Sequence, residues 1–245
     1  MSNIFIFIIL EGDFIIYAVL LSGGLGTRVG YDIPKQFINI NNKPILSYCI
    51  EKFIEINSFE KIIVSSPKNY FQETIDLVDK YFPNNDRIIV IFGGKTRQDT
   101  LMNSLDYIKM IDDSEDIIVV NHDAARIFVS QDQIIKCINY TKKFGSSSPI
   151  IPSTDVIIET NGELVENMPN RYDMVHVQTP QGFKLNEYLQ LYNNLSQEDV
   201  ENIHEIVKVY YLNNKFIKLF DGEKSNFKIT NPIDIKIAES ILKWE

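Results

Sequence analysis

Cysteine is scarce in this 245-residue chain, which contains only Cys49 and Cys137. These two residues lie far apart, and neither they nor the three histidines, His122, His176 and His204, show the close spacing of zinc ligands. The sequence therefore indicates neither a zinc site nor a disulfide framework. We expect two buried thiols in a protein of a reducing compartment.

The sequence also lacks a long hydrophobic run and an excess of positive charge. The apolar stretch at residues 4–10 is too short to span a bilayer, and it has neither the basic start nor the small-residue cleavage site of a signal peptide. Lys and Arg number 24 against 33 Asp and Glu, a formal net charge of −9, whereas nucleic-acid binders usually present a basic face. We therefore expect a cytoplasmic protein with no nucleic-acid partner and no membrane association.

Residues 21–36, LSGGLGTRVGYDIPKQ, follow an apolar strand and lack two common nucleotide-binding fingerprints. No glycine completes G-x-G-x-x-G after Gly24, which argues against a dinucleotide site, and no lysine follows Gly26 or Gly30 as a P-loop requires. The glycines still let backbone N–H groups approach an anion, and Arg28 and Lys35 add positive charge. We predict a cradle for nucleotide phosphates with its own catalytic cations; a plain glycine-rich turn is the alternative.

Strand-like and helix-like segments alternate along the chain. A near-continuous apolar run typical of a buried strand lies at 14–21, and further strands are expected at 61–65, 87–92, 116–121, 148–151 and 216–220. Apolar residues recur at helical spacing at 45–54, 71–82, 99–110, 131–144, 185–195, 200–212 and 232–243. This alternation predicts a single α/β domain at 15–245, with a mainly parallel sheet covered by helices on both faces. Residues 1–14 are an N-terminal extension to which we assign no role.

A hairpin signal interrupts this alternation. Two short β-like runs, at 156–159 and 164–165, flank Asn161-Gly162, a dipeptide typical of tight hairpin turns. A hairpin inserted between the strands of a sheet often projects from it. We predict an arm at about 153–172 that packs on a second subunit and forms a homodimer; a surface hairpin of a monomer is the alternative.

Residues suited to phosphate chemistry follow two further strands. Asp123 ends one strand and suits Mg²⁺, which takes one or two carboxylates together with substrate phosphates, while Arg126 suits either a phosphate or a structural pair with Asp123. Residues 93–100 follow another strand and open a helix, so their N–H groups and the Thr100 hydroxyl suit a nucleotide, or the segment is simply a helix cap. Because these loops and 22–36 all leave the carboxyl ends of strands, we expect them to meet in one crevice.

Six segments in this order resemble the sugar- and polyol-phosphate cytidylyltransferases, from about residue 17 to the C-terminus. They are Ser22-Gly23-Gly24-Leu25-Gly26-Thr27-Arg28, Pro34-Lys35-Gln36, Arg97-Gln98-Asp99-Thr100, His122-Asp123-Ala124-Ala125-Arg126, Gln178-Thr179-Pro180-Gln181 and Asn226-Phe227-Lys228-Ile229-Thr230. Two branches are similar: the ribitol-5-phosphate enzymes of wall or capsule polymer synthesis and the 2-C-methyl-D-erythritol 4-phosphate enzymes of isoprenoid synthesis. The tail at 222–230 and Ser22-Gly23-Gly24 look more like the ribitol branch.

The resemblance implies a Rossmann-like nucleotidyltransferase fold, a three-layer sandwich, that joins CTP to an alditol phosphate. With D-ribitol 5-phosphate the products would be CDP-ribitol and pyrophosphate. The resemblance assigns catalysis to Arg28 and Lys35 and Mg²⁺ to Asp123. It assigns nucleotide binding to Leu21, Ser22, Gly23, Gly24, Leu25, Gly26, Gly93, Arg97, Thr100, Asp123, Ala124 and Arg126. Acceptor binding falls to Asp155, Arg171, Thr179, Glu205 and Lys228, with Arg171 placed to serve a partner's site in a dimer.

The chain departs from the family pattern at three points. Ile127 stands where proline is usual, Val156 where threonine is common, and His204-Glu205 where we align Thr-Asp. The last two lie near the expected acceptor pocket, so methylerythritol phosphate or another sugar or polyol phosphate is an alternative acceptor. A nucleotide-binding relative without turnover is a second alternative. A related glycosyltransferase usually carries Asp-x-Asp at a strand end, whereas two alanines follow Asp123.

Overall fold

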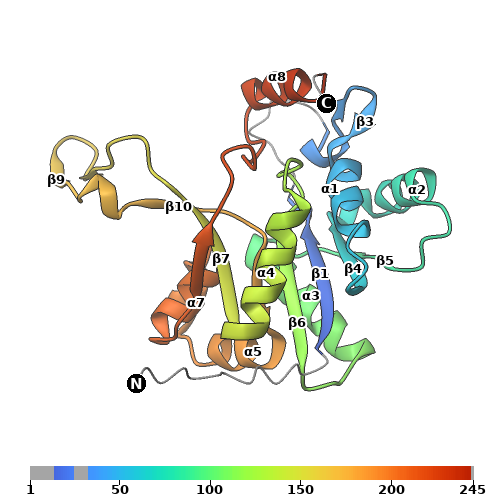
Figure 1. Ribbon diagram of the computed structural model, residues 1–245, viewed down its shortest axis with the longest axis horizontal. Coiled ribbons are helices and arrows are strands. Elements are labelled where there is room, and N and C mark those ends of the chain that lie inside the picture. The colour runs from blue at the N-terminus through green and yellow to red at the C-terminus, as the bar shows by residue number, and fades with distance from the viewer. Residues whose placement is uncertain (1–13, 25–32, 244–245) are drawn as a thin grey trace, which may run out of the picture.

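The computed structural model describes residues 14–24 and 33–243 (Figure 1). Within these residues a mixed eight-stranded sheet lies between two layers of helices. The predicted α/β fold with a mainly parallel sheet is therefore confirmed. Residues 1–13 of the predicted N-terminal extension lie outside the described residues.

Four parallel strands form one half of the sheet. In spatial order they are β6 (Ile117–Asp123), β1 (Ile15–Leu21), β4 (Phe59–Ser66) and β5 (Ile88–Phe92). The strands β1, β4 and β6 carry apolar runs at 15–21, 62–64 and 117–120, which are buried because helices cover both faces of the sheet. Their carboxyl ends meet at one edge of the sheet, which the polar loops then occupy.

The other half of the sheet mixes directions around β7 (Ser146–Pro152). The strands β10 (Val175–Val177) and β11 (Gln181–Lys184) pair antiparallel with β7, and β11 also pairs antiparallel with β6. The strand β12 (Lys218–Asp221) runs parallel to β7. The sequence did not indicate β10 or β11, which are short and carry no alternating pattern.

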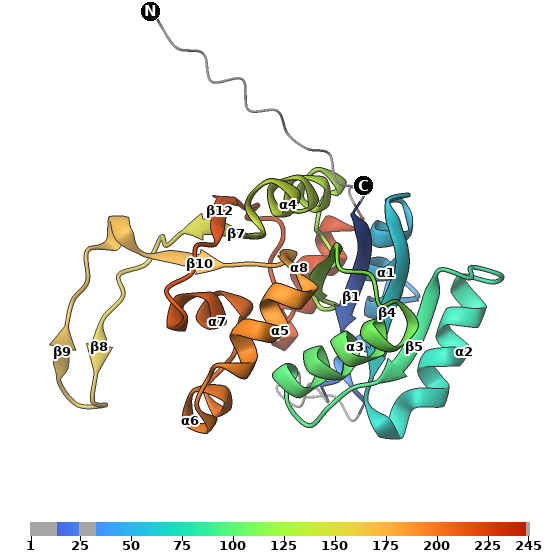
Figure 2. The same cartoon turned by 90° about the horizontal axis from the view of Figure 1, so that it is seen from below.

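Helices cover both faces of the sheet. Figure 2 shows α4 on one side and α3 and α5 on the other. One core cluster joins the sheet to α1 (Ile45–Ile54), α2 (Phe71–Tyr81) and α4 (Gln131–Phe144). A second cluster joins the opposite face to α3 (Arg97–Ile111), α5 (Leu185–Asn193) and α7 (Ile206–Leu212). Cys49 and Cys137 are free and buried in the first cluster, as expected.

The prediction of one helix over 200–212 is wrong, because the chain forms two helices there. The short helix α6 (Gln197–Glu201) ends, and α7 begins only at Ile206. Glu205 has an extended backbone, with φ of −144° and ψ of 151°, so the helix cannot continue through it. The intervening turn, residues 202–205, carries His204 and Glu205.

A third apolar cluster lies beyond the carboxyl ends of the parallel strands. The helix α8 (Pro232–Ile241) packs there on the hairpin β2 (Asn39–Ile40) and β3 (Lys43–Pro44), at the top of Figure 1. Ile127, one of the departures from the family pattern, is buried in this cluster, so its side chain has a packing role. The 3₁₀ turn η2 (Lys35–Phe37) precedes the hairpin.

The predicted hairpin projects from the sheet. It contains β8 (Glu159–Thr160) and β9 (Val165–Asn167), followed by the 3₁₀ turn η4 (Arg171–Asp173). Both ribbon views show it extending away from the rest of the molecule (Figures 1 and 2). We call residues 153–172 the arm.

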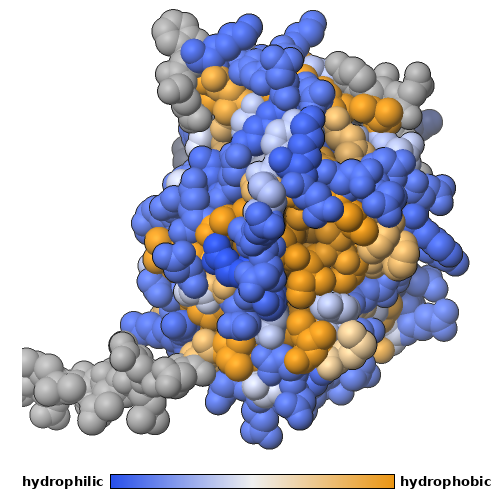
Figure 3. Space-filling view, turned by 90° about the vertical axis from the view of Figure 1, so that its right-hand side faces the viewer, coloured by the Kyte–Doolittle hydropathy of each residue, from blue (hydrophilic) through white to orange (hydrophobic). Residues whose placement is uncertain are grey.

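The opposite end of the molecule exposes an edge of the sheet. Figure 3 views the side of α2 and β5, where hydrophobic atoms gather at the surface. Within the described chain, β5 pairs on one side only, with β4, and its last residue, Phe92, is 50% exposed. The ring of Phe92 packs on Phe71 at 4.1 Å between centroids, which shields part of this edge.

Candidate active site

A cavity of about 420 Å³ opens at the carboxyl ends of β1, β5 and β6. Pockets for small ligands typically span roughly 300–1,000 Å³, so this volume suits a nucleotide or a sugar phosphate. The loops predicted to share a crevice do meet here. The lining residues are Leu21, Ser22, Gly23, Gly24, Lys35, Gln36, Ile45, Gly94, Lys95, Thr96, Arg97, Thr100, Asp123, Ala124, Ala125, His204, Glu205, Lys228 and Thr230.

The glycine loop after β1 packs directly on the loop after β5. A Cβ atom at Gly23 would lie 2.8 Å from the Thr100 Oγ1, and one at Gly93 would lie 3.0 Å from the Gly23 Cα. Such distances leave no room for a side chain, so the two loops need glycine to approach this closely. The Thr100 hydroxyl accepts from the Gly94 N–H at 3.0 Å and so helps to shape the loop.

The second part of the predicted phosphate cradle is fixed by hydrogen bonds across the loop. The Gln36 Nε2 donates to the Ser22 carbonyl at 2.7 Å, and the Ser22 hydroxyl donates to the Ser65 carbonyl. Lys35 opens η2 directly after Pro34, and its Nζ donates to the Ile229 carbonyl at 3.3 Å. Lys35 therefore stands at the cavity wall between the glycine loop and the C-terminal segment.

The start of α3 forms the next wall. The Thr96 hydroxyl accepts from the Asp99 N–H at 3.0 Å, and the Asp99 carboxylate accepts from the Thr96 N–H at 3.0 Å. This capping box satisfies orphan N–H groups at the helix start. The helix-cap interpretation of 93–100 is therefore correct, and the same segment lines the cavity.

Asp123 lies at the centre of a cluster of positive charges. Its carboxylate is 3.2 Å from the Arg97 Nε, 2.8 Å from the Lys228 Nζ and 3.7 Å from the Arg126 Nε. Burial alone would raise the pKa of the carboxyl, but the three cations, Arg97 foremost, hold this pKa well below its ordinary value. Asp123 is therefore ionised at neutral pH.

Glu205 is the second carboxylate of the cavity. Its Oε2 lies 3.1 Å from the Arg97 Nη2. Burial raises the pKa of the Glu205 carboxyl above its ordinary value, while Arg97 acts in the opposite direction. The broken helix explains its position, because the 202–205 turn brings Glu205 to the cavity from the C-terminal half of the chain.

A layer of polar groups behind the cavity holds its segments together. The Thr179 Oγ1 accepts from the Asp123 N–H at 3.1 Å, and the Asn226 Nδ2 donates to the Thr179 carbonyl at 2.7 Å. The Arg126 Nη1 donates to the Asn226 carbonyl at 2.9 Å. Three motifs that lie far apart in the sequence thus form one hydrogen-bonded unit.

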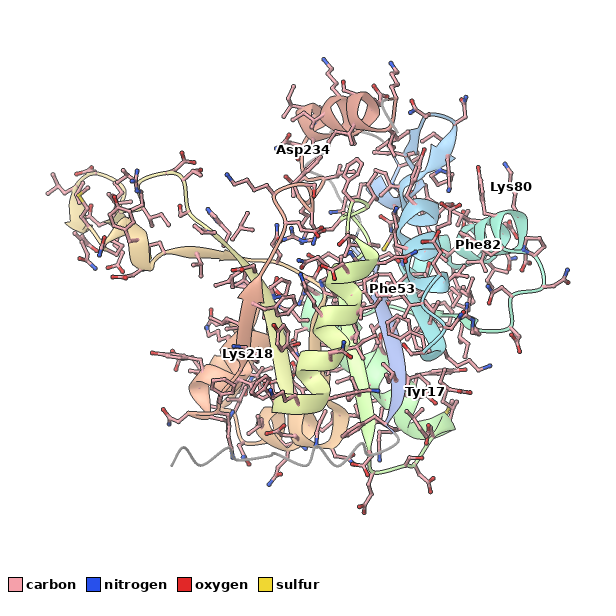
Figure 4. The ribbon with its side chains drawn as sticks, in the orientation of Figure 1. Tyr17, Phe53, Lys80, Phe82, Lys218 and Asp234 are labelled. Carbon is pink, nitrogen blue, oxygen red and sulfur yellow. The ribbon has the colours of Figure 1, made fainter. Side chains whose placement is uncertain are left out.

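His122 belongs to this supporting layer. Its Nε2 pairs with the Arg126 carbonyl and its Nδ1 with the Thr179 hydroxyl, each at 2.9 Å. The ring also packs on Phe53, which Figure 4 shows on α1, with 5.2 Å between centroids. Burial lowers the pKa of the imidazole to about 4, so His122 is neutral at pH 7. A buried histidine with both nitrogens engaged is a structural group, not a proton carrier for the cavity.

The C-terminal motif is anchored where α8 begins. The Asp234 carboxylate accepts from the Thr230 N–H at 2.7 Å, the Thr230 hydroxyl at 2.9 Å and the Asn231 N–H at 2.9 Å. Figure 4 shows Asp234 near the top of the view, at the base of α8. The Ile229 N–H in turn donates to the Ala125 carbonyl at 2.9 Å. These bonds anchor the chain directly after Lys228, whose Nζ faces Asp123.

The structure brings most of the predicted site residues together, with some exceptions. Those that line the cavity are Leu21, Ser22, Gly23, Gly24, Lys35, Arg97, Thr100, Asp123, Ala124, Glu205 and Lys228. Gly93, Arg126 and Thr179 stand behind the wall, where they support Gly23 and Asp123. Leu25, Gly26 and Arg28 lie outside the described residues.

Asp155 and Arg171, predicted to bind the acceptor, do not reach the cavity of their own chain. Both are exposed on the arm, which extends away from the sheet. The Arg171 guanidinium lies 5.2 Å from the centroid of the Tyr172 ring. A role for these residues therefore requires a second chain.

The sequence-based assignment missed eight of the described lining residues. Most of them lie inside one of the six motifs or the 93–100 segment, so assigning a role to every residue of those segments would have included them. Ile45 opens α1 and carried no such signal. The eight are Gln36, Ile45, Gly94, Lys95, Thr96, Ala125, His204 and Thr230.

The donor set of the cavity fits a magnesium ion shared with a phosphorylated substrate. Among residues 14–24 and 33–243, no group of three or more His, Cys, Asp or Glu side chains could hold a metal ion on its own. Asp123 offers a single ionised carboxylate at the wall of a cavity with room for phosphates. Mg²⁺ typically takes one or two carboxylates and completes its shell with water and phosphate oxygens.

The chain is similar to known proteins in both sequence and fold. The family model for IspD, 2-C-methyl-D-erythritol 4-phosphate cytidylyltransferase, matches residues 16–244. Among solved structures, 2-C-methyl-D-erythritol 4-phosphate cytidylyltransferase from Francisella tularensis is 27% identical, with a TM-score of 0.76 and coverage of 92% of this chain and 99% of that one.

Two more distant structures share the fold. 4-Diphosphocytidyl-2C-methyl-D-erythritol synthase from Anaerococcus prevotii is 22% identical, with a TM-score of 0.78 over 94% of this chain and 97% of its own. 2-C-methyl-D-erythritol 4-phosphate cytidylyltransferase from Thermus thermophilus is 21% identical, with a TM-score of 0.72 over 94% and 99%. Within the part of the chain described here, no helix is long and apolar enough to cross a membrane.

Proposed function

We propose that this chain, which belongs to the 2-C-methyl-D-erythritol 4-phosphate cytidylyltransferase family, transfers the cytidylyl group of CTP to 2-C-methyl-D-erythritol 4-phosphate. The family consists of CTP-dependent cytidylyltransferases, and the chain is an enzyme of this type. The charge of the cavity is the structural observation that carries the proposal. Among residues 14–24 and 33–243, the cations that line the cavity against the carboxylates Asp123 and Glu205 are Lys35, Lys95, Arg97 and Lys228. Such a site suits two phosphorylated substrates.

The reaction joins two anions and needs no protein base. A phosphate oxygen of the acceptor attacks the α-phosphorus of CTP, a new P–O bond forms, and the bond from the α-phosphorus to the bridging oxygen breaks to release pyrophosphate. A phosphate monoester has a second pKa of about 6 and is largely dianionic at neutral pH. The nucleophile is therefore already ionised, which agrees with the structural role of His122.

Catalysis then depends on positioning and charge, as in other phosphoryl transfers. Lys35 would neutralise the α-phosphate and the leaving pyrophosphate, together with Arg28. Lys228 would bind the acceptor phosphate from the opposite wall. Mg²⁺, held by Asp123 and the phosphates of CTP, would supply additional positive charge to the triphosphate.

Ribitol 5-phosphate is the second candidate acceptor. The tail at 222–230 supports it, whereas the Glu205 carboxylate at the cavity can accept hydrogen bonds from the hydroxyls of either acceptor. With this acceptor the enzyme would form CDP-ribitol for wall or capsule polymers. The reaction and the roles of Lys35 and Asp123 are the same for both acceptors.

A paired acceptor assay tests the proposed function. We expect pyrophosphate release from CTP and Mg²⁺ with methylerythritol phosphate, at a kcat/KM at least about 100-fold above that with ribitol 5-phosphate, a ratio that a few hydroxyl contacts can supply. The reverse ratio would assign the ribitol reaction. Tight CTP binding with no pyrophosphate release from either acceptor would contradict the proposed function and favour a non-catalytic relative.

The arm supports a proposal about assembly. Its apolar side chains are exposed: Leu164 by 69%, Met168 by 65% and Tyr172 by 83%. A two-stranded hairpin is marginally stable on its own, and apolar side chains gathered on a projecting element are typical of an interface. We propose that the arm packs on a second copy of this chain, where Arg171 and Asp155 would reach the partner's cavity.

Charged substitutions in the arm test the dimer. Wild-type protein at micromolar concentration is expected to scatter light as twice the 28.3 kDa of one chain, whereas Leu164→Asp combined with Met168→Asp should give a single chain. Buried carboxylates without partners would disfavour the interface. Phe216→Asp is the matched control, because Phe216 is 64% exposed and lies outside the arm. A wild-type mass of 28.3 kDa would argue against the proposed dimer.

A further inference from the structure

Arg97 joins three separate parts of the cavity wall. It opens α3, and each nitrogen of its guanidinium meets a different group. The Nε donates to the Asp123 Oδ1 at 3.2 Å, the Nη1 donates to the His204 carbonyl at 3.0 Å, and the Nη2 lies 3.1 Å from the Glu205 Oε2. The end of β6 and the 202–205 turn are thus held by one side chain.

Asp123 and Glu205, the two carboxylates that Arg97 joins, depend on Arg97 to different degrees. Asp123 also has ion pairs with Lys228 and Arg126, so it keeps two cations if Arg97 is changed. Glu205, among the residues the structure describes, forms no ion pair with another cation within 4.0 Å. The Asn202 and Ile203 N–H groups bond back to α6, so the start of the turn is anchored without Arg97. Loss of Arg97 would therefore release the Glu205 carboxylate, at the end of the turn, more than it would disturb Asp123.

We propose that Arg97 is a positioning residue for the acceptor, and that it acts by holding Glu205 and the 202–205 turn against the cavity. The inference rests on the proposed cytidylyltransferase reaction and deepens it. It changes the role that the sequence suggested for Arg97, which was nucleotide binding. The guanidinium is held within the protein by hydrogen bonds to Asp123 and the His204 carbonyl and by the ion pair with Glu205. Selectivity for the acceptor then depends in part on α3, an element of the nucleotide side.

The chemistry of the side chain makes the proposal testable by a conservative change. A guanidinium presents several donors in a rigid plane, whereas an ammonium is a compact charge on a flexible stem. Arg97→Lys keeps a positive charge near Asp123 but cannot reach the His204 carbonyl, Glu205 and Asp123 together. The variant therefore removes the bridge and leaves the net charge of the cavity unchanged.

Arg97→Lys is expected to lower kcat/KM for the acceptor by about 30-fold, within the scale of losses from small misplacements of a substrate. The acceptor for this measurement is whichever of the two gives the higher kcat/KM in the paired acceptor assay. The affinity for CTP, measured by calorimetry without acceptor, should stay within about twofold because Arg97→Lys keeps a positive charge beside Asp123. Arg87→Lys is the matched control, since Arg87 also donates to two main-chain carbonyls, those of Ile54 and Ile56, and does not line the cavity. It should match the wild type in both measurements.

A double-mutant cycle with Glu205→Gln separates positioning from a general loss of structure. Glu205→Gln alone should lower kcat/KM for the acceptor and leave the affinity for CTP unchanged. This variant tests the proposal even if Arg97→Lys folds poorly. The double variant should be no worse than Arg97→Lys alone, because the two residues act as one unit. Multiplicative losses, or a loss of CTP affinity in Arg97→Lys with unchanged acceptor kinetics, would overturn the proposal. Failure of the wild type with every acceptor would instead contradict the proposed function.

Discussion

Asp123→Asn should lower kcat by about 1,000-fold or more, the largest effect that we expect from a single substitution in this chain. The variant loses the carboxylate that would hold Mg²⁺, and it leaves Arg97, Lys228 and Arg126 without their common counter-ion. Lys228 would then face the acceptor phosphate without the carboxylate that orients its ammonium group. The rate should be measured as pyrophosphate release at saturating CTP, acceptor and Mg²⁺.

Removing one partner of a buried charge cluster also costs stability, by about 3–5 kcal/mol, so the folded fraction must be checked by thermal unfolding. Asp112→Asn is the control. Asp112 accepts a hydrogen bond of 2.8 Å from the Tyr17 hydroxyl at the far end of the sheet, where Figure 4 labels Tyr17. Its loss should affect stability but not turnover. A folded Asp123→Asn enzyme that retains a tenth of the wild-type kcat would remove Asp123 from the proposed mechanism.

Lys35→Ala should lower kcat by at least about 100-fold, the scale of losing one preorganised electrostatic donor. Lys35 carries charge at the wall where the α-phosphate would lie, and its Nζ donates to the Ile229 carbonyl. The folded fraction of the variant should be checked by thermal unfolding. Pyrophosphate release under saturating conditions gives the rate.

The chain contains a closely matched control for this variant. Lys68 also follows a proline and also opens a 3₁₀ turn, η3 (Lys68–Tyr70), and the preceding Pro67 has φ of −59° and ψ of 140° against −58° and 139° at Pro34. Lys68 is exposed and does not line the cavity, so Lys68→Ala should leave the rate unchanged. Equal kinetics for the two alanine variants would show that Lys35 is not a catalytic cation.

The sequence predicted elements best where local signals and tertiary packing agree. The bounds predicted for α4, 131–144, match the structure, because the Ser130 hydroxyl caps its first turn and Gly145 ends it with φ of +86°. The helix predicted at 45–54 after Pro44 is also correct. In both segments the apolar residues that recur at helical spacing face the core. The local sequence signals and the tertiary packing therefore favour the same helix.

The errors occur where a long-range contact overrides a local pattern. Apolar residues continue at helical spacing from Val200 through Ile206 to Tyr210, so nothing local marks the break at 202–205. The break is explained by a long-range contact: Arg97, which is distant in sequence, binds the His204 carbonyl and the Glu205 carboxylate in the turn. The short antiparallel strands β10 and β11 likewise have no pattern of their own and depend on the edges of β6 and β7.

The site, like the fold, was predicted in part, and its errors also concern contacts that the local sequence does not contain. Motif order predicted which loops meet at the cavity, because parallel strands place their carboxyl ends at one edge. It did not separate residues that face the cavity from those that support it: Thr179 and Arg126 stand behind Asp123. That distinction depends on side-chain direction, which a motif does not contain.

The hydrogen-bonded unit of residues 122–126, 178–181 and 226–230 also has a consequence for the order of protein synthesis. Ribosomes make the chain from its N-terminus, and a domain folds as its segments emerge. The glycine loop and Asp123 emerge about a hundred residues or more before Asn226, Lys228 and Ile229, which bind Arg126, Asp123 and Lys35. A nascent chain that has not yet reached residue 229 thus presents an incomplete cavity, and substrates can engage the finished site only after the 226–230 segment has emerged.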